Sequence, residues 1–465
     1  MKSNCRRTIA VIVLGAVAAG LPKLGVAQEQ AAAGVPRGPL RVLEENPRYF
    51  TDGSGKAVYL TGSHTWSSFQ DSFKGDQARP TFDYAGYLSF LKERGHNFVR
   101  MWTWEGGVND VRYEPLPYAR TDSGKFDLNK FNEAYFERLR SRVAAARAQG
   151  IYVSIMLFQG WSIYSHGHGN PWPIHPFHAA NNVNGIDGDR DRDGEGKEVH
   201  SLEIPAVTRL QEAYVRKVID TVNDFDNVLY EVTNETAIYS KNWQYHIVNF
   251  VKQYEKTKSK QHPIGMTAFD SGREGSMDAL LRGPADWISP QNDGESGDYQ
   301  SDPPAADGRK VIVSDTDHLW GVGGGRDWVW KSFTRGHQPI YMDPLRKGDK
   351  SEDEEMEMEG ARKAMGQTRR FAERVALREM KPAQEISSTR YCLATPGKEY
   401  IVYLPKGGKV TVDLSRAKGE VTVEWLDPVQ EKTVAAANAS GGATRELGAP
   451  FAGPAVLYLK TTGRE

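Results

Sequence analysis

One pattern repeats about eight times along this chain: a short run of apolar, β-favouring residues, a polar cluster, and a segment with apolar residues at helical spacing. Parallel strands with crossover helices produce this pattern, and eight such units close into a (β/α)8 barrel. We expect strands over 57–62, 98–104, 151–158, 227–233, 263–267, 287–289, 310–314 and 339–342. We expect helices over 81–94, 129–149, 205–224, 243–258 and 351–377. The alternative is a doubly wound open sheet, but no G-x-G-x-x-G turn follows the first strand, which argues against a nucleotide-binding version.

The first 27 residues have the pattern of a secretory signal peptide. A basic start with two arginines precedes an apolar run over 9–21, and small residues stand before a predicted cleavage after Ala27. The arginine pair also permits a twin-arginine signal. Removal of the peptide takes away Cys5 and leaves Cys392 as the one cysteine, so no intramolecular disulfide can form. We therefore expect an exported protein of the bacterial periplasm or exterior, without a membrane span.

Three further segments follow the signal peptide. Residues 28–39 are rich in Ala, Gly and Pro and predict a flexible leader, and residues 40–380 contain the barrel pattern. Residues 381–465 carry short alternating strands, which predict a small β-sandwich. Its strands are expected over 400–404, 409–414, 421–425 and 455–460. This segment is either a carbohydrate-binding module or a buttress for the barrel. The W-L-D-P sequence over 425–428 resembles a buried turn, which favours the buttress.

Carboxylates at the ends of two predicted strands suggest a catalytic pair. In a parallel barrel the active site lies at the carboxyl ends of the strands. The fourth strand ends in Asn234 and Glu235, and the seventh ends in Asp315 and Asp317. Glycosidic cleavage needs one acid that protonates the leaving oxygen and a second carboxylate that attacks C1 or activates water. We predict that Glu235 is the acid/base and Asp315 the nucleophile, with Asp317 as the alternative.

Aromatic and polar residues at the other strand ends are expected to bind a carbohydrate substrate. A net charge of −1 and the absence of a Lys/Arg cluster at a strand end argue against a nucleic acid or phosphate ligand. Glu231 is expected to form a buried pair with Arg100 rather than to break bonds. The predicted substrate-binding residues are His64, Trp66, Arg100, Trp104, Trp161, Asn234, Asp317 and His318.

Several motifs together resemble a known family. L-Y-E-V-T-N-E-T is similar to the fourth-strand signature of clan A glycoside hydrolases. With G-S-H-T-W, G-H-N-F-V-R-M-W and a C-terminal W-x-D-P, the chain resembles the apiosidase-like glycosidases, whose C-terminal module is named a collagen-binding domain. The resemblance implies that Glu235 is the acid/base, that Asp315 occupies the nucleophile's position, and that Arg100 and Asn234 support the site. It covers roughly residues 40–465.

Two departures from the clan pattern affect the mechanism. The seventh-strand acid is usually Glu but is Asp here, and the sixth strand ends in P-Q-N-D instead of an aromatic residue. The clan implies retention, with carboxyl groups about 5–5.5 Å apart, whereas the shorter Asp leaves inversion open, at about 6.5–9.5 Å. A non-catalytic glycan- or matrix-binding protein is the competing class of function.

An acidic motif predicts a calcium site, although no cofactor is needed for the chemistry. Asp189, Asp191, Asp193 and Gly194 match the first, third, fifth and sixth positions of a calcium-binding loop. Position twelve is His200 instead of Glu, so Glu195 or Glu198 would complete the ligand set. The alternative is a solvated charged loop.

A histidine-rich stretch precedes this motif and raises the alternative of a zinc-dependent hydrolase. Its candidate ligands are His166, His168, His175 and His178, but their spacing lacks H-E-x-x-H. We favour a substrate-contacting loop in which Trp161 and Trp172 stack on sugar rings.

Overall fold

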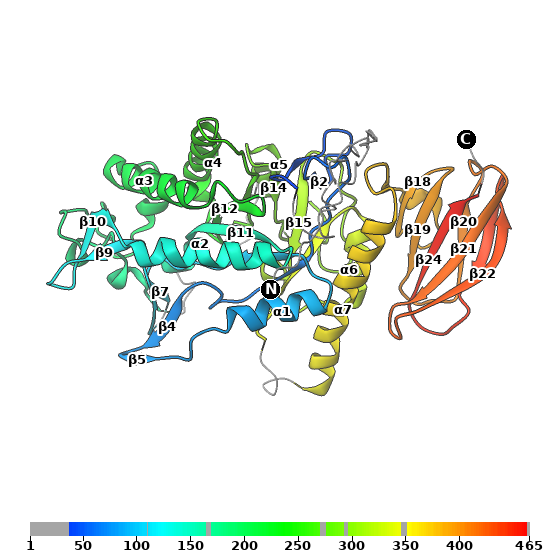
Figure 1. Cartoon of the computed structure of the whole chain (residues 1–465), viewed down its shortest axis with the longest axis horizontal. Helices are drawn as coiled ribbons and strands as arrows, with labels where there is room; N and C mark the ends of the chain where they lie inside the picture. Colours follow the sequence, from blue (N-terminus) through cyan, green and yellow to red (C-terminus); the bar gives the residue numbers. More distant parts are fainter. Residues whose placement is uncertain are drawn as a thin grey trace, which may run out of the picture. The chain divides into compact units, whose positions relative to one another are not determined.

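The computed structural model describes residues 37–108, 110–163, 169–269, 276–292, 296–345 and 351–462. The predicted signal peptide lies outside the described residues, as do residues 28–36 of the predicted leader. Eight parallel strands form a closed barrel, in the order β11-β12-β13-β14-β15-β16-β3-β6. Figure 1 labels four of them, β11, β12, β14 and β15. The eight strands are β3 (Gly62–His64), β6 (Phe98–Met101), β11 (Tyr152–Gln159), β12 (Val228–Asn234), β13 (Ile264–Met266), β14 (Trp287–Ile288), β15 (Val311–Asp315) and β16 (Gln338–Met342). The predicted (β/α)8 fold is confirmed.

The barrel strands are buried on both sides, as parallel strands in this fold are. Every residue of β11 and β12 is buried. Alternate side chains point into the barrel and toward the surrounding helices, and each set packs in its own apolar cluster. The inner cluster also contains Leu40 and Phe50, so the segment before the barrel covers its lower end. That segment forms two short paired strands, β1 (Arg41–Val42) and β2 (Phe50–Thr51).

The predicted helices are present, with shifts of a few residues at their ends. They are α1 (Tyr84–Glu93), α2 (Glu133–Ala148), α3 (Pro205–Val222), α4 (Lys241–Glu255) and α7 (Glu352–Arg374). The first turn of α7 is acidic, and Ser351 and Glu354 form a reciprocal capping box at its start. Two short helices, α5 (Ser276–Arg282) and α6 (Arg326–Thr334), were not predicted. None of the described helices is long and apolar enough to cross a membrane.

Irregular segments after the barrel strands build the rim of the mouth. A four-stranded sheet contains β4 (Asp71–Lys74), β5 (Gln77–Ala78), β7 (Gly107–Val108) and β8 (Val111–Glu114). A second pair, β9 (Tyr118–Arg120) and β10 (Phe126–Phe131), precedes α2. The segment between β11 and α3 contains short 3-10 helices, including η1 (Gly160–Ser162) and η4 (Lys197–His200). These segments surround the carboxyl ends of the strands, where the catalytic residues are expected.

The C-terminal segment forms an antiparallel β structure, as predicted. Its six-stranded sheet has the order β17-β18-β19-β24-β21-β22, and β20 pairs with β23. The strands are β17 (Lys381–Pro382), β18 (Cys392–Thr395), β19 (Glu399–Leu404), β20 (Lys409–Asp413), β21 (Glu420–Asp427), β22 (Lys432–Ser440), β23 (Thr444–Gly448) and β24 (Ala455–Thr461). Four of these, β17, β18, β22 and β23, were not predicted.

The β structure packs on the barrel through α6 and α7. Trp330 of α6 stacks on Tyr403 of β19, with 6.0 Å between ring centroids. Gln367 of α7 donates a hydrogen bond of 3.0 Å to the carbonyl of Pro428, which directly follows β21. Trp425 is buried as expected, but it belongs to β21 and not to a turn. These contacts are those of a segment that supports the barrel.

Candidate active site

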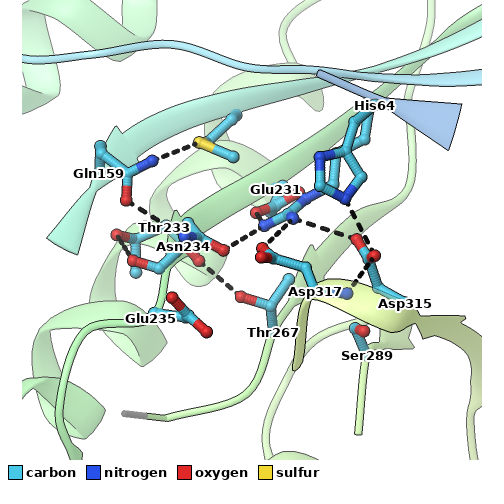
Figure 2. A network of polar contacts seen from close by, with 12 residues as sticks. His64, Gln159, Glu231, Thr233, Asn234, Glu235, Thr267, Ser289, Asp315 and Asp317 are labelled. Carbon is cyan, nitrogen blue, oxygen red and sulfur yellow. Dashed lines mark hydrogen bonds and ion pairs between the residues drawn. The ribbon is translucent and has the colours of Figure 1, made fainter. Parts of the chain in front are cut away.

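Arg100 makes hydrogen bonds to three carboxylates inside the barrel, those of Glu231, Asp315 and Asp317, which Figure 2 labels. Its Nε and Nη2 atoms donate to both oxygens of Glu231, at 2.7 and 2.6 Å. Nη2 also donates to Oδ1 of Asn234 at 2.6 Å. Nη1 donates to Oδ2 of Asp315 and to Oδ2 of Asp317, each at 3.1 Å. The predicted buried pair of Arg100 and Glu231 is confirmed, and Arg100 joins β6, β12 and β15 across the barrel.

The electrostatics of this network depend on Arg100. Burial alone would lower the pKa of Arg100, but the carboxylates of Glu231, Asp315 and Asp317 raise it well above its usual value. Arg100 therefore carries a permanent positive charge. Burial raises the pKa of Glu231, and Arg100 opposes this shift. The single guanidinium group of Arg100 thus forms ion pairs with three carboxylates.

Asp315 is enclosed by this network. Its Oδ1 atom is 3.0 Å from Nε2 of His64 and accepts a 3.0 Å hydrogen bond from the backbone N–H of Asp317, while Oδ2 accepts from Arg100. Its side chain is fully buried. Burial disfavours the charged form, but His64 and Arg100 outweigh it and hold the pKa of Asp315 well below its usual range. Asp315 is therefore an ionised group with partners on both of its oxygens.

Asp317, which we predicted as the alternative to Asp315, lies beside Glu235. The strand β15 ends at Asp315, whose side chain caps the 3-10 turn η6 (Thr316–His318). Carboxylate oxygens of Asp317 and Glu235 and a ring nitrogen of His318 all lie within 4.8 Å of one another. Burial, together with the neighbouring charge of Asp315, raises the pKa of Asp317. The acid that faces Glu235 is Asp317, whereas Asp315 lies beneath it with His64.

Glu235 follows the last residue of β12 in a strained backbone conformation. Its φ of +43° is uncommon for a residue other than glycine, and such residues concentrate at functional sites. The indole Nε1 of Trp161 donates to Oε2 of Glu235 at 2.6 Å. Gly160, the residue before Trp161, lies close to the backbone of Asn234 and Glu235. A Cβ atom at Gly160 would be 2.6 Å from the carbonyl oxygens of both residues. This close approach of two loops fixes Trp161 against the carboxylate.

Asn234 and His318 bond to each other beside the two acids. Oδ1 of Asn234 is 3.2 Å from Nε2 of His318, and Nδ1 of His318 is 2.8 Å from the hydroxyl of Ser289. Burial and the charge of Arg100 lower the pKa of His318 to about 3, so the imidazole is neutral. Since Oδ1 of Asn234 can only accept, Nε2 of His318 carries the proton. Asn234 is fully buried and holds protein groups, whereas we had predicted that it binds a substrate hydroxyl.

The other predicted substrate-binding residues divide into exposed and buried side chains. Trp66 is 37% exposed, and Trp161 is partly exposed. Trp104 is buried, stacks on Tyr113 with 4.5 Å between centroids, and donates its indole N–H to the carbonyl of Trp66. His64 is fully buried and stacks on Trp102. His64, Trp104, Arg100 and Asn234 therefore support the site from below.

The prediction that Trp172 stacks on a sugar is wrong, because its side chain is only 1% exposed. The candidate zinc ligands His166 and His168 lie outside the described residues. Nε2 of His175 is 3.5 Å from a carboxylate oxygen of Glu105, and Nδ1 of His178 accepts the backbone N–H of Ala180. Within the described part of the chain, neither His175 nor His178 belongs to a cluster that could hold a metal ion.

Glu105 was missed by the sequence analysis. Its Oε1 atom accepts the backbone N–H of Gln159 at 2.8 Å and lies 2.9 Å from Nε2 of His200. Burial opposes ionisation, but His200 and His175 lower the pKa of Glu105 to about 2. The side chain of Gln159 in turn contacts Asn234 and the backbone of Trp161. Glu105 thus holds the loop that carries Trp161 in position. The sequence analysis missed this role because it depends on contacts between segments that are far apart in the sequence.

The predicted calcium ligands are only partly brought together. Asp189 and Asp191 converge with Glu198, and their oxygens lie within 4.8 Å of one another. Glu195 instead forms an ion pair with Lys197. Asp193 accepts the backbone N–H of Glu195 at 2.8 Å.

Comparisons with known proteins agree with this architecture. Residues 44–184 match the family model described as "Apiosidase-like, catalytic domain", and residues 380–454 match "Putative collagen-binding domain of a collagenase". No curated protein matches the chain.

Three solved structures share the fold at low sequence identity. A protein described as a glycoside hydrolase is 14% identical, with a TM-score of 0.60 over 93% of this chain and 99% of its own. A glycoside hydrolase family 5 protein from Bacteroides vulgatus is 14% identical, with a TM-score of 0.61 over 93% and 95%. A protein from Bacteroides vulgatus that is described as a "putative glycoside hydrolase" is 15% identical, with a TM-score of 0.59 over 92% of this chain and 83% of its own.

Proposed function

We propose that this chain, a glycoside hydrolase with an apiosidase-like catalytic domain, cleaves its substrate with Glu235 as acid/base and Asp317 as nucleophile. The observation that carries the proposal is the approach of Glu235, Asp317 and His318 to within 4.8 Å at the carboxyl ends of β12 and β15. Such a separation supports a retaining mechanism, since retaining enzymes hold their carboxyl groups about 5–5.5 Å apart and inverting enzymes about 6.5–9.5 Å.

In the first step, an oxygen of Asp317 attacks the anomeric carbon while Glu235 gives its proton to the departing glycosidic oxygen. The C1–O bond to the leaving group breaks, and a C1–O bond to Asp317 forms. In the second step, Glu235 takes a proton from water, whose oxygen displaces Asp317 from C1. Both residues return to their starting protonation states.

Asp315 fits a supporting role better than a nucleophilic one. Both of its oxygens are bonded to protein groups, and its side chain is fully buried. Its charge, with that of Glu231, offsets the charge of Arg100. Arg100 can therefore orient Asp317 without strongly reducing the nucleophilicity of its carboxylate. For these reasons we assign the nucleophile to Asp317 instead of Asp315.

The substrate class follows from the family match and the exposed aromatic residues. Apiose-containing side chains of plant polysaccharides are the first candidates, because the matching family model is named for apiosidase activity. Trp66 and Trp161 provide indole surfaces at the mouth, and Trp161 also contacts the proposed acid. The signal-peptide pattern supports action in the bacterial periplasm or exterior.

The decisive experiment is a screen of sugars released from apiose-containing and other plant and microbial polysaccharides. Wild-type enzyme should release a sugar from at least one of them, and Glu235→Gln should lose turnover while still binding that polysaccharide. A wild-type protein that binds glycan but releases no sugar from any of them would refute the hydrolase proposal in favour of a glycan-binding protein.

A further inference from the structure

We propose that the segment over 189–198 binds a calcium ion through Asp189, Asp191 and Glu198, and that this ion fixes one wall of the catalytic mouth. The proposal does not depend on the identity of the substrate. Carboxylate oxygens of the three residues lie within 4.8 Å of one another. Calcium takes six to eight oxygen ligands at about 2.3–2.6 Å, so one ion can contact all three carboxylates.

A buried oxygen atom of Asp189 points to a ligand. Oδ2 of Asp189 accepts the backbone N–H of Gly194 at 3.0 Å. Oδ1 is buried from solvent and has no hydrogen-bond partner among the described residues. A buried carboxylate oxygen without a partner is costly, because it loses its hydration without compensation. A cation between Asp189 and its two acidic neighbours would remove that cost.

Glu198 supplies a second buried oxygen. Glu198 is only 9% exposed, and its Oε1 atom accepts a hydrogen bond of 3.0 Å from the backbone N–H of Asp191. This contact draws the end of the segment onto its beginning. Three carboxylates held this close repel one another unless a positive charge lies between them.

Two of the basic residues of the same segment are engaged with other acids. Arg190 pairs with Glu203, and Lys197 pairs with Glu195. The D-x-D-x-D-G pattern that begins at Asp189 is that of calcium-binding loops. Glu198 takes the place of the late acidic ligand, while Glu195, one of our predicted ligands, is turned to Lys197.

The segment is connected to the catalytic residues in two ways. Trp172 packs so closely on Gly196 that a Cβ atom there would lie 2.3 Å from its ring. Two residues after Glu198, His200 contacts Glu105 at 2.9 Å and Thr236 at 3.4 Å. Thr236 directly follows Glu235, so an ion that holds Glu198 in place also holds the contact of His200 with the catalytic turn.

The test uses full-length protein that has been stripped of metal with a chelator and then titrated with CaCl2 by calorimetry. We expect one site per chain, and a rise of several degrees in the melting temperature when calcium is added, since a ligand that binds only the folded state stabilises it. Terbium should bind in place of calcium and show luminescence sensitised by Trp172. Glu198→Gln should weaken calcium binding at least tenfold, and Glu195→Gln should change it less than twofold.

Asp191→Asn provides a second variant, because Asp191 is exposed and its substitution leaves the packing of the segment intact. It should also weaken binding at least tenfold. The proposal fails if wild-type protein shows neither heat nor a melting shift at about 10 mM CaCl2, above the weakest range of extracellular calcium sites. It also fails if Glu195→Gln loses as much affinity as Glu198→Gln, or if magnesium stabilises the protein as well as calcium does.

Discussion

Replacing Arg100 with methionine should destabilise the fold strongly and in a pH-dependent way. The change removes the cation that bonds to Glu231, Asp315 and Asp317 inside the barrel. Removing one partner of a buried ion pair typically costs about 3–5 kcal/mol, because the remaining charge is left without compensation. We therefore expect the free energy of unfolding at pH 8 to fall by about 3–5 kcal/mol.

The pH dependence follows from the three carboxylates. Without Arg100, their pKa values in the folded protein rise above those in the unfolded chain, so the folded state takes up protons as the pH falls. The stability lost in Arg100→Met should therefore be largest at pH 8 and smaller at pH 5. Urea unfolding followed by tryptophan fluorescence at both pH values measures this difference.

Arg140→Met is the matched control for this experiment. Arg140 makes two hydrogen bonds of 2.7 Å to Asp224, but both side chains are about half exposed. Exposed ion pairs contribute about 0–1 kcal/mol, so this variant should unfold almost as the wild type does. A loss below about 1 kcal/mol in Arg100→Met, or a loss that is equal at pH 5 and pH 8, would refute the role of Arg100.

Three further substitutions test the site through kinetics. Asp315→Asn removes a charge that raises the pKa of Asp317, so the acid limb of the kcat/KM profile should move to lower pH; an unmoved limb would contradict this coupling. Trp161→Phe removes the indole donor to Glu235 and should reduce kcat/KM by about 10- to 100-fold. An unchanged kcat/KM would show that this hydrogen bond does not contribute to catalysis. Gly160→Ala should displace the Glu235 backbone, lowering stability by about 1–3 kcal/mol and kcat/KM at least tenfold, whereas wild-type values would mean that the loop moves freely.

The barrel could be predicted because its strands are short apolar runs that alternate with helical patterns. All eight predicted strands correspond to observed ones, with ends displaced by a few residues. The first was expected over 57–62 but β3 begins at Gly62, since the preceding residues only lead the chain into the barrel. The strand β22 was missed because most of its alanine-rich residues are exposed and show no alternation.

The positions of Asp315 and Asp317 show where pattern reasoning reaches its limit. Alternation along a strand would turn both side chains inward only if the strand continued to Asp317, but β15 ends at Asp315 and a 3-10 turn follows. Asp is a common residue before a helical turn, because its side chain accepts a backbone N–H. The sequence D-T-D therefore contained a signal of a capped turn that would have separated the two carboxylates.

Other site residues are defined by long-range packing. Glu105 gains its role from His200 and from Gln159, which lie 95 and 54 residues away in the sequence. Trp172 is buried because the segment that contains Gly188 and Gly196 folds back over it. Local composition suggested an exposed loop here, and only the folded chain shows that the aromatic residue belongs to a core cluster.

The pairing of Glu235 with Asp317 is tested most directly by trapping the glycosyl-enzyme. In Glu235→Gln, a glycoside with a dinitrophenyl leaving group needs no acid for the first step, but water lacks its base in the second. The covalent intermediate should therefore accumulate, with the mass of one sugar added to the protein and fragmentation locating it on Asp317. An adduct on Asp315, or a product of inverted anomeric configuration without any adduct, would contradict the assignment.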